Sequence, residues 1–321
     1  MKFTKSLVAA TALTALSFGA VAQTNWNMAT PYPESEFHTK NIQQFVADVN
    51  KMSDGDLNIK VHSAQSLFKH PEIPRAVRTG QVEIGETLMA NLSNQDPVFQ
   101  VDAIPFLVTG YESAQKLWQG QRPFVEKYLS DNGMRLIYAV PWPGQGFYMK
   151  NEVKSIADME GVKFRTYNST TEKMASLMKA VPTTVEAVEI PQAFTAGIVD
   201  AMVTSAATGV RTEAWTFANY YYDTQAWMPK NMIYVNEKAF KRLSPKAQKA
   251  LIDAGKTAET RGWKMSEEVF TETTNTLKEK MQYRQANEDL SKSLAQIGDV
   301  MSVSWAEAVG PNAEKILAPL R

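Results

Sequence analysis

The hydrophobic pattern changes its period repeatedly along the chain, and this change limits the fold more than any other feature. Leu57, Ile59 and Val61 alternate with polar neighbours, which is typical of a half-buried strand. Residues 38–53 instead place their apolar side chains at helical spacing. Strand-like and helix-like patterns alternate over residues 25–88, and the alternation continues beyond them. Alternating strands and helices predict an α/β fold with largely parallel sheets.

Two features divide this predicted α/β chain. A strand ends in a Pro-rich turn, so we expect the chain to cross between two lobes near 141–144 and to return near 229. One helical pattern then covers 245–281 and would span about 55 Å at 1.5 Å per residue if it were unbroken. Gly255 and Gly262 lie within this pattern and weaken the expectation that the helix is continuous.

The predicted lobes each take two pieces of the chain. Lobe I is expected to comprise 23–142 plus 230–270, and lobe II 143–229 plus 281–321, with the helix over 245–281 spanning both. Two α/β lobes that meet at the carboxyl ends of their strands form a cleft, which is where such folds bind ligands.

The first 22 residues have the pattern of an export signal. Lys2 and Lys5 precede an apolar run, and Ala20-Val21-Ala22 is a small-x-small cleavage site. The alternative, a membrane anchor, needs roughly 20 apolar residues, more than this run supplies. We expect cleavage near Ala22/Gln23 and a mature protein in the periplasm. The sequence holds no cysteine, so disulfides and a cysteine-linked lipid anchor are excluded.

The residues show little sign of catalytic chemistry. Basic and acidic side chains number 34 each, and this balance argues against a nucleic-acid-binding protein. No common nucleotide, hydrolase or metalloprotease motif is present, and no cofactor or metal is expected. We interpret the histidines and the acidic pairs as surface or capping groups rather than as metal or glycosidase sites. These residues are His38, His62, His70, Glu34/Glu36 and Glu186/Glu189.

An ordered series of segments resembles the substrate-binding subunits of TRAP transporters, the DctP-type extracytoplasmic solute receptors. In chain order the segments are "FVADVNKMSDGDLNIKVHSAQSL" (45–67), "AVRTGQVEIGE" (76–86), "DAIPFLV" (102–108), "SIADMEGVKFRT" (155–166), "QAFTAGIVDAMVTS" (192–205) and "YVNEKAFKRLSPKAQKAL" (234–251). The resemblance implies a two-lobe periplasmic-binding-protein fold with mixed sheets, hinge crossings and a long helix spanning both lobes. It covers essentially the whole mature chain.

The resemblance also implies a ligand clamp. Arg165 matches the arginine that holds the carboxylate of an organic acid in this family, and a guanidinium can donate two parallel hydrogen bonds to a carboxylate. Thr204 and Ser205 occupy the place where the family often has an amide side chain. Gly146 stands where some members with larger acidic ligands have a second arginine, so we expect one bound carboxylate.

Aromatic residues concentrate at the two expected crossings and favour a cleft lined with rings. Trp142, Phe147 and Trp227 flank these crossings, and Gln145 adds an amide. Together they favour a modest, partly flat acid that is either aromatic or a short 2-oxo or 2-hydroxy acid. A dicarboxylate remains open, with Lys69 as its second cation.

The implied activity is capture without catalysis. The receptor would close on a small carboxylate by hinge bending and deliver it to the membrane permease subunits of a TRAP transporter, acting as a monomer that is not itself embedded in the membrane. Two alternatives stay open at this point. One is a ligand sensor for a signalling partner, and the other is a secreted lyase or hydrolase that acts on carboxylates.

Overall fold

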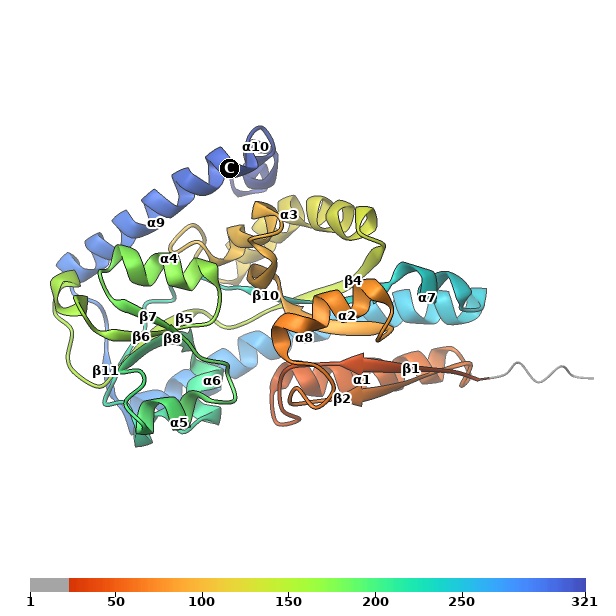
Figure 1. Cartoon of the computed structure of the whole chain (residues 1–321), viewed down its shortest axis with the longest axis horizontal. Helices are drawn as coiled ribbons and strands as arrows, with labels where there is room; N and C mark the ends of the chain where they lie inside the picture. Colours follow the sequence, from red (N-terminus) through yellow and green to blue (C-terminus); the bar gives the residue numbers. More distant parts are fainter. Residues whose placement is uncertain (1–22) are drawn as a thin grey trace, which may run out of the picture.

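A computed structural model describes residues 23–321, and the expected signal peptide, 1–22, lies outside the described residues. The chain builds two mixed sheets that lie side by side, with one long helix, α8 (Pro245–Lys280), running along both (Figure 1). Among residues 23–321, no helix combines the length and the hydropathy that a bilayer crossing needs.

The first sheet has the strand order β2-β1-β3-β10-β4. Its strands are β1 (Thr24–Ala29), β2 (Leu57–His62), β3 (Ile84–Leu88), β4 (Met134–Pro141) and β10 (Lys230–Asn236). β1 pairs in parallel with β2 and β3, whereas β10 runs antiparallel to both β3 and β4. Packed around this sheet are α1 (Phe37–Met52), α2 (Ile73–Thr79), α3 (Tyr111–Asp131) and α7 (Glu237–Arg242).

The second sheet has the order β11-β9-β5-β8-β6-β7. Its strands are β5 (Gln145–Met149), β6 (Lys163–Thr166), β7 (Val181–Thr184), β8 (Ala201–Ser205), β9 (Tyr220–Tyr222) and β11 (Gln282–Arg284). β6 lies parallel to β7 and β8, whereas β5 is antiparallel to β8 and β9. Its helices include α4 (Ser169–Leu177), α5 (Ile190–Thr195) and α6 (Ala206–Arg211).

Two short crossing segments join the sheets in the middle of the chain. The chain leaves the first sheet after Pro141 and enters the second at Gln145, and it returns between Tyr222 and Lys230. The segments lie against each other, since the Trp142 amide donates to the Pro229 carbonyl at 2.8 Å, so the expected crossings are confirmed. The expected lobe boundaries themselves stay a prediction.

The long helix α8 (Pro245–Lys280) is continuous over 36 residues. It contacts α1 and β4 beside the first sheet and α6 beside the second, so it spans both. The glycines that weakened the expectation of continuity mark close approaches instead. A Cβ at Gly255 would lie 2.6 Å from Ile137 Cγ2, and one at Gly262 would lie 2.4 Å from Val140 Cγ2.

The C-terminal helices return to the first sheet's side. α9 (Glu288–Val309) packs against residues 97–103, where the Trp305 indole donates to the Pro97 carbonyl at 2.9 Å. α10 (Asn312–Leu317) packs on α3. α9 therefore crosses between the sheets on another side of the molecule from α8 (Figure 1).

Side-chain caps fix the starts of two helices beside the second sheet. Asn168 caps α4, with its Oδ1 accepting from the Thr171 amide. The Ser205 side chain caps α6 by accepting from the Thr208 amide.

Candidate functional site

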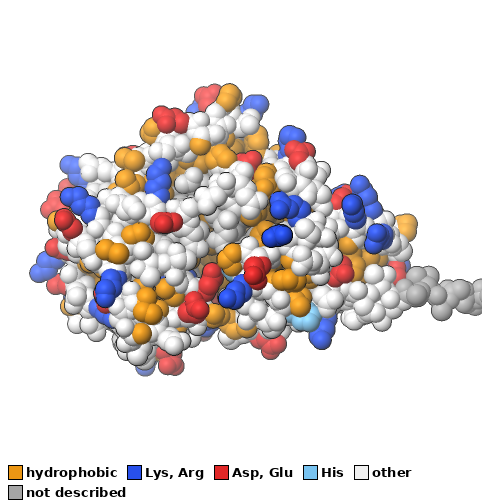
Figure 2. Space-filling model, in the orientation of Figure 1, with side chains coloured by type: hydrophobic (Ala, Val, Ile, Leu, Met, Phe, Trp, Pro, Cys, Tyr) orange, Lys and Arg blue, Asp and Glu red, His pale blue; other side chains and the backbone are white. Residues whose placement is uncertain are grey.

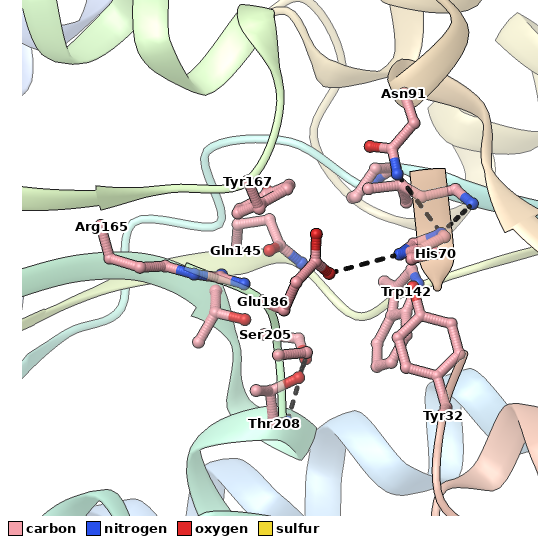
Figure 3. A pocket seen from close by; sticks show the side chains of 14 residues that line it. Tyr32, His70, Asn91, Trp142, Gln145, Arg165, Tyr167, Glu186, Ser205 and Thr208 are labelled. Carbon is pink, nitrogen blue, oxygen red and sulfur yellow. Dashed lines mark hydrogen bonds and ion pairs between the residues drawn. The ribbon is translucent and has the colours of Figure 1, made fainter. Parts of the chain in front are cut away.

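A cavity of about 470 Å³, including solvent at its mouth, lies between the two sheets. The first sheet and the loops around it supply Tyr32, His70, Leu88, Asn91, Trp142 and Pro229. The second sheet and its loops supply Gln145, Arg165, Tyr167, Glu186, Ala187, Thr204, Ser205 and Thr208. Figure 3 shows Arg165 on one side of the cavity and His70 with Tyr32 on the other. A ligand held here would contact both halves of the molecule.

Arg165 is the cation of this cavity. It lies near the carboxyl end of β6 and is 4% exposed, and its Nε donates to the Val185 carbonyl at 2.9 Å. The guanidinium carbon lies 4.5 Å from the centre of the Tyr167 ring. Within residues 23–321, no carboxylate comes within 4.0 Å of it. Burial lowers the pKa of Arg165 to about 10, so the side chain stays charged at neutral pH and its terminal nitrogens can bind an anion.

His70 faces the cavity as a neutral ring. The Leu88 amide donates to its Nε2 at 3.2 Å, which places the ring proton on Nδ1. Nδ1 lies 3.9 Å from Glu186 Oε2, the pair joined by a dashed line in Figure 3. Burial, with a smaller contribution from Arg165, lowers the pKa of His70 to about 3. His70 therefore presents an uncharged N–H donor.

Glu186 brings a carboxylate to the same cavity. It follows β7, which pairs in parallel with β6, so the ends of these strands put it near Arg165. Burial raises the pKa of Glu186 above its ordinary value, and the nearby Arg165 offsets part of this increase. The side chain is 27% exposed and has no hydrogen bond to any described side chain. It is a strong acceptor with free capacity.

A buried hydrogen-bond network fixes Trp142, which forms one side of the cavity. The indole N–H donates to Asn231 Oδ1 at 2.9 Å, and Asn231 Nδ2 donates to Glu86 Oε1 at 2.7 Å. Because an indole can only donate, these bonds fix the orientation of the Asn231 amide. The Tyr32 ring stands edge-on to Trp142 with ring centres 5.1 Å apart. Two aromatic groups therefore form a rigid apolar side of the cavity.

The cavity brings together five of the residues predicted from the sequence: Arg165, Thr204, Ser205, Gln145 and Trp142. Gln145 Nε2 donates to the Pro143 carbonyl at 2.9 Å, which leaves the side-chain oxygen of Gln145 able to accept from a ligand. The remaining predicted residues do not line it. Phe147 lines a separate apolar cavity of about 260 Å³, Trp227 is buried, and Lys69 is exposed.

Several lining residues, and two buried residues that do not line the cavity, were missed or misinterpreted. Glu186 was expected to be a solvated surface group and instead lines the cavity, and Glu36 is 3% exposed. His38 and His70 were expected at the surface or as caps and are 3% and 6% exposed. Glu186 follows β7, whose four residues are too few to show a strand period, so no sequence pattern marked it as a cavity residue. No sequence spacing marked Tyr32, Asn91, Tyr167 or Thr208.

The chain matches the family of bacterial extracellular solute-binding proteins, family 7, over residues 28–309. It belongs to this family. A relative from Chromohalobacter salexigens, named a solute-binding protein, is 21% identical over 252 residues, covering 77% of this chain and 74% of its own.

Two crystal structures resemble this chain closely. DctP6 of Bordetella pertussis, an extracytoplasmic solute receptor binding pyroglutamic acid, has 41% identity and a TM-score of 0.90, covering 92% of this chain and 99% of its own. A marine-metagenome TRAP solute-binding protein specific for pyroglutamate has 35% identity and a TM-score of 0.90, covering 92% and 98%.

Family 7 membership confirms the resemblance, the two-lobe fold class and the expectation of a transport-related binding protein instead of an enzyme. The secreted lyase or hydrolase alternative is thereby removed. Within the described part of the chain, no three His, Cys, Asp or Glu side chains group as metal ligands.

Proposed function

We propose that this family 7 receptor binds a small cyclic monocarboxylate of the pyroglutamate class in the cavity between its sheets. The observation that carries the proposal is Arg165, a buried charge whose terminal nitrogens have no carboxylate partner among residues 23–321. Burying an unpaired charge is costly, so a ligand carboxylate that forks onto Arg165 would offset that cost. The two receptors that are 41% and 35% identical to this chain bind pyroglutamate, and they support the same class of ligand.

The rest of the cavity suits a small ligand with one carboxylate. Arg165 is the only Lys or Arg among the lining residues, and Glu186 would repel a second carboxylate. Lys69, considered above as a second cation, is exposed and does not line the cavity. Thr204 and Ser205 would add hydroxyl contacts to the bound acid, and Trp142 would pack on its ring.

Delivery would follow from closure. The ligand would join groups from both sheets, and the closed surface would be recognised by the permease subunits of a TRAP transporter in the periplasm. The receptor would act as a monomer after removal of residues 1–22.

The test compares wild type with Arg165→Lys and Arg165→Ala by titration calorimetry with pyroglutamate. The protein is first unfolded and refolded to remove co-purified ligand. Each charge-assisted hydrogen bond contributes roughly 1.5–3 kcal/mol, so losing the fork is expected to weaken binding by about 100-fold or more. Lys keeps the charge but not the fork, and we expect it to recover only part of the loss.

The control is Arg135→Ala, which removes an arginine paired with Glu237 away from the cavity. It should bind like the wild type. If Arg165→Ala binds pyroglutamate as tightly as the wild type does, Arg165 is not the clamp.

A further inference from the structure

A negative side chain in a cavity that takes an anion needs an explanation. Glu186 lines the same cavity as Arg165, yet the two do not form an ion pair within 4.0 Å. Glu186 Oε2 lies 3.9 Å from Nδ1 of the neutral His70, too far for a hydrogen bond. A carboxylate placed here weakens the binding of a plain organic anion through like-charge repulsion. Its presence is therefore informative about the ligand.

The backbone holds Glu186 at a fixed position relative to the clamp. Arg165 Nε donates to the carbonyl of Val185, the residue directly before Glu186. This contact lies just beyond the parallel pairing of β6 and β7, in which Arg165 is opposite Thr183 and Thr166 is opposite Thr184. In Figure 3 the Glu186 side chain lies between Arg165 and His70. A carboxylate on the Arg165 fork would therefore bring the adjoining part of the ligand to Glu186 and His70.

Glu186 and His70 have complementary hydrogen-bonding roles. The Glu186 carboxylate only accepts, and the His70 Nδ1–H only donates, because the Leu88 amide occupies Nε2 at 3.2 Å. The neutral state of His70 follows from its burial, which lowers its pKa to about 3. An acceptor beside a donor is the complement of an amide, which carries an N–H and a C=O.

We propose that Glu186 and His70 recognise a ring amide beside the ligand carboxylate, with Glu186 accepting from the ligand N–H and His70 donating to its carbonyl oxygen. This assignment rests on the proposed function, because Arg165 must hold the carboxylate first. Glu186 is then the residue that selects lactam acids over ring ketones, lactones and dicarboxylates of the same size. A site built to hydrogen-bond an N–H rejects the analogue that lacks it.

The experiment measures the affinities of two ligands for the refolded protein by titration calorimetry. One ligand is pyroglutamate, and the other is its carbocyclic analogue, in which the ring N–H is a CH₂ group. We expect the wild type to prefer pyroglutamate by roughly 10- to 100-fold, the range of one hydrogen bond to a charged group. Glu186→Leu should weaken pyroglutamate binding by that factor, leave the analogue unchanged or tighter, and bring the two affinities close together.

Glu172→Gln is the matched control, since Glu172 is an exposed carboxylate on α4 outside the cavity, and its preference should equal that of the wild type. Thermal unfolding of each ligand-free variant checks folding. His70→Ala should weaken both ligands alike, because both carry the ring carbonyl.

Two results would overturn the inference while leaving the proposed function intact. One is a wild type that binds the two ligands equally, and the other is a Glu186→Leu variant that loses affinity for both by the same factor. A wild type that binds neither ligand would instead remove the proposed function and the inference together.

Discussion

At the scale of single residues, burial raises the pKa of a carboxyl group in the network that holds Trp142. Glu86 is fully buried, accepts from Asn231 and Thr30, and has His38 Nδ1 at 3.8 Å. Burial, which outweighs the two hydrogen bonds, raises the pKa of Glu86 from 4.5 to about 7. The folded protein therefore keeps a proton on this group that the unfolded chain loses at lower pH.

The first residue-scale prediction follows from that difference. Glu86 stabilises the folded state at low pH, and this contribution is lost as pH rises through about 7. We expect the free energy of unfolding of wild type, relative to Glu86→Gln, to fall by about 2–3 kcal/mol between pH 5 and pH 8. The difference between the two proteins isolates Glu86 from His38, whose lowered pKa acts in the opposite direction.

Urea denaturation at a series of pH values measures both curves. A difference that does not change with pH would show that Glu86 has an ordinary pKa in the folded protein. Gln is chosen because the Thr30 hydroxyl can accept from its amide while Asn231 donates to its carbonyl.

The sequence could identify Arg165 and four other residues of the cavity lining, but not Glu186 or His70. Arg165 lies at the end of a strand-like segment inside a specific family motif, and both signals are local. Glu186 and His70 meet across 116 positions of the chain, and their burial depends on how two sheets face each other. Glutamate is mostly exposed in folded proteins and histidine is intermediate, so neither residue type by itself indicates a buried site.

At the scale of elements, close packing explains why α8 contains glycine. A Cβ at Gly262 would lie 2.4 Å from Val140 Cγ2 and 2.6 Å from Asn41 Nδ2. Asn41 cannot easily move, because its Nδ2 donates to the Ala258 carbonyl at 2.9 Å and its Oδ1 accepts from Arg261 at 2.8 Å. The helix can approach β4 and α1 this closely only without a side chain.

The element-scale prediction is that Gly262→Ala destabilises the protein, although alanine is the better helix former. Overpacking costs typically about 1–3 kcal/mol, against a helix-propensity gain of about 1 kcal/mol, so we expect a net loss of up to about 2 kcal/mol. Thr260→Ala, at an exposed position of the same helix, is the control and should be neutral or slightly stabilising. Urea denaturation decides the matter, and a more stable Gly262→Ala would contradict the packing argument.

Long, strongly periodic elements could be predicted, and short edge strands could not. The 36 residues of α8 gave a clear helical period, and β2 gave a clear alternation. β7, β9 and β11 have only three or four residues and are strands because a neighbour pairs with them. A pattern needs more residues than that to show its period.

At the scale of the whole molecule, the two halves are held together by contacts that no local pattern could predict. The Arg211 Nε donates to Glu36 Oε2 at 3.0 Å, joining the end of α6 to the start of α1. The hydroxyl oxygens of Ser93 and Ser169 lie 3.0 Å apart. The partners are separated by 175 and 76 positions, so their contacts depend on how the two sheets face each other.

Glu36 makes this contact energetically important. Its side chain is 4% exposed, and burial raises its pKa while Arg211 lowers it. Without Arg211, the closed protein would keep an unpaired buried carboxylate, whereas an open arrangement would let water reach it. Arg211 should therefore shift the equilibrium between open and closed states toward closure.

The whole-molecule prediction is that Arg211→Ala favours the open state. In small-angle X-ray scattering, the ligand-free variant should have a larger radius of gyration than the wild type, and saturating ligand should restore the wild-type value. Because ligand must then supply part of the closing free energy, its affinity should fall by about 10-fold. Arg135→Ala removes an ion pair between β4 and α7 on the first sheet's side and should leave the scattering unchanged. An identical radius for Arg211→Ala and wild type would mean that the Glu36 contact follows closure without driving it, and that packing around α8 holds the two sheets together.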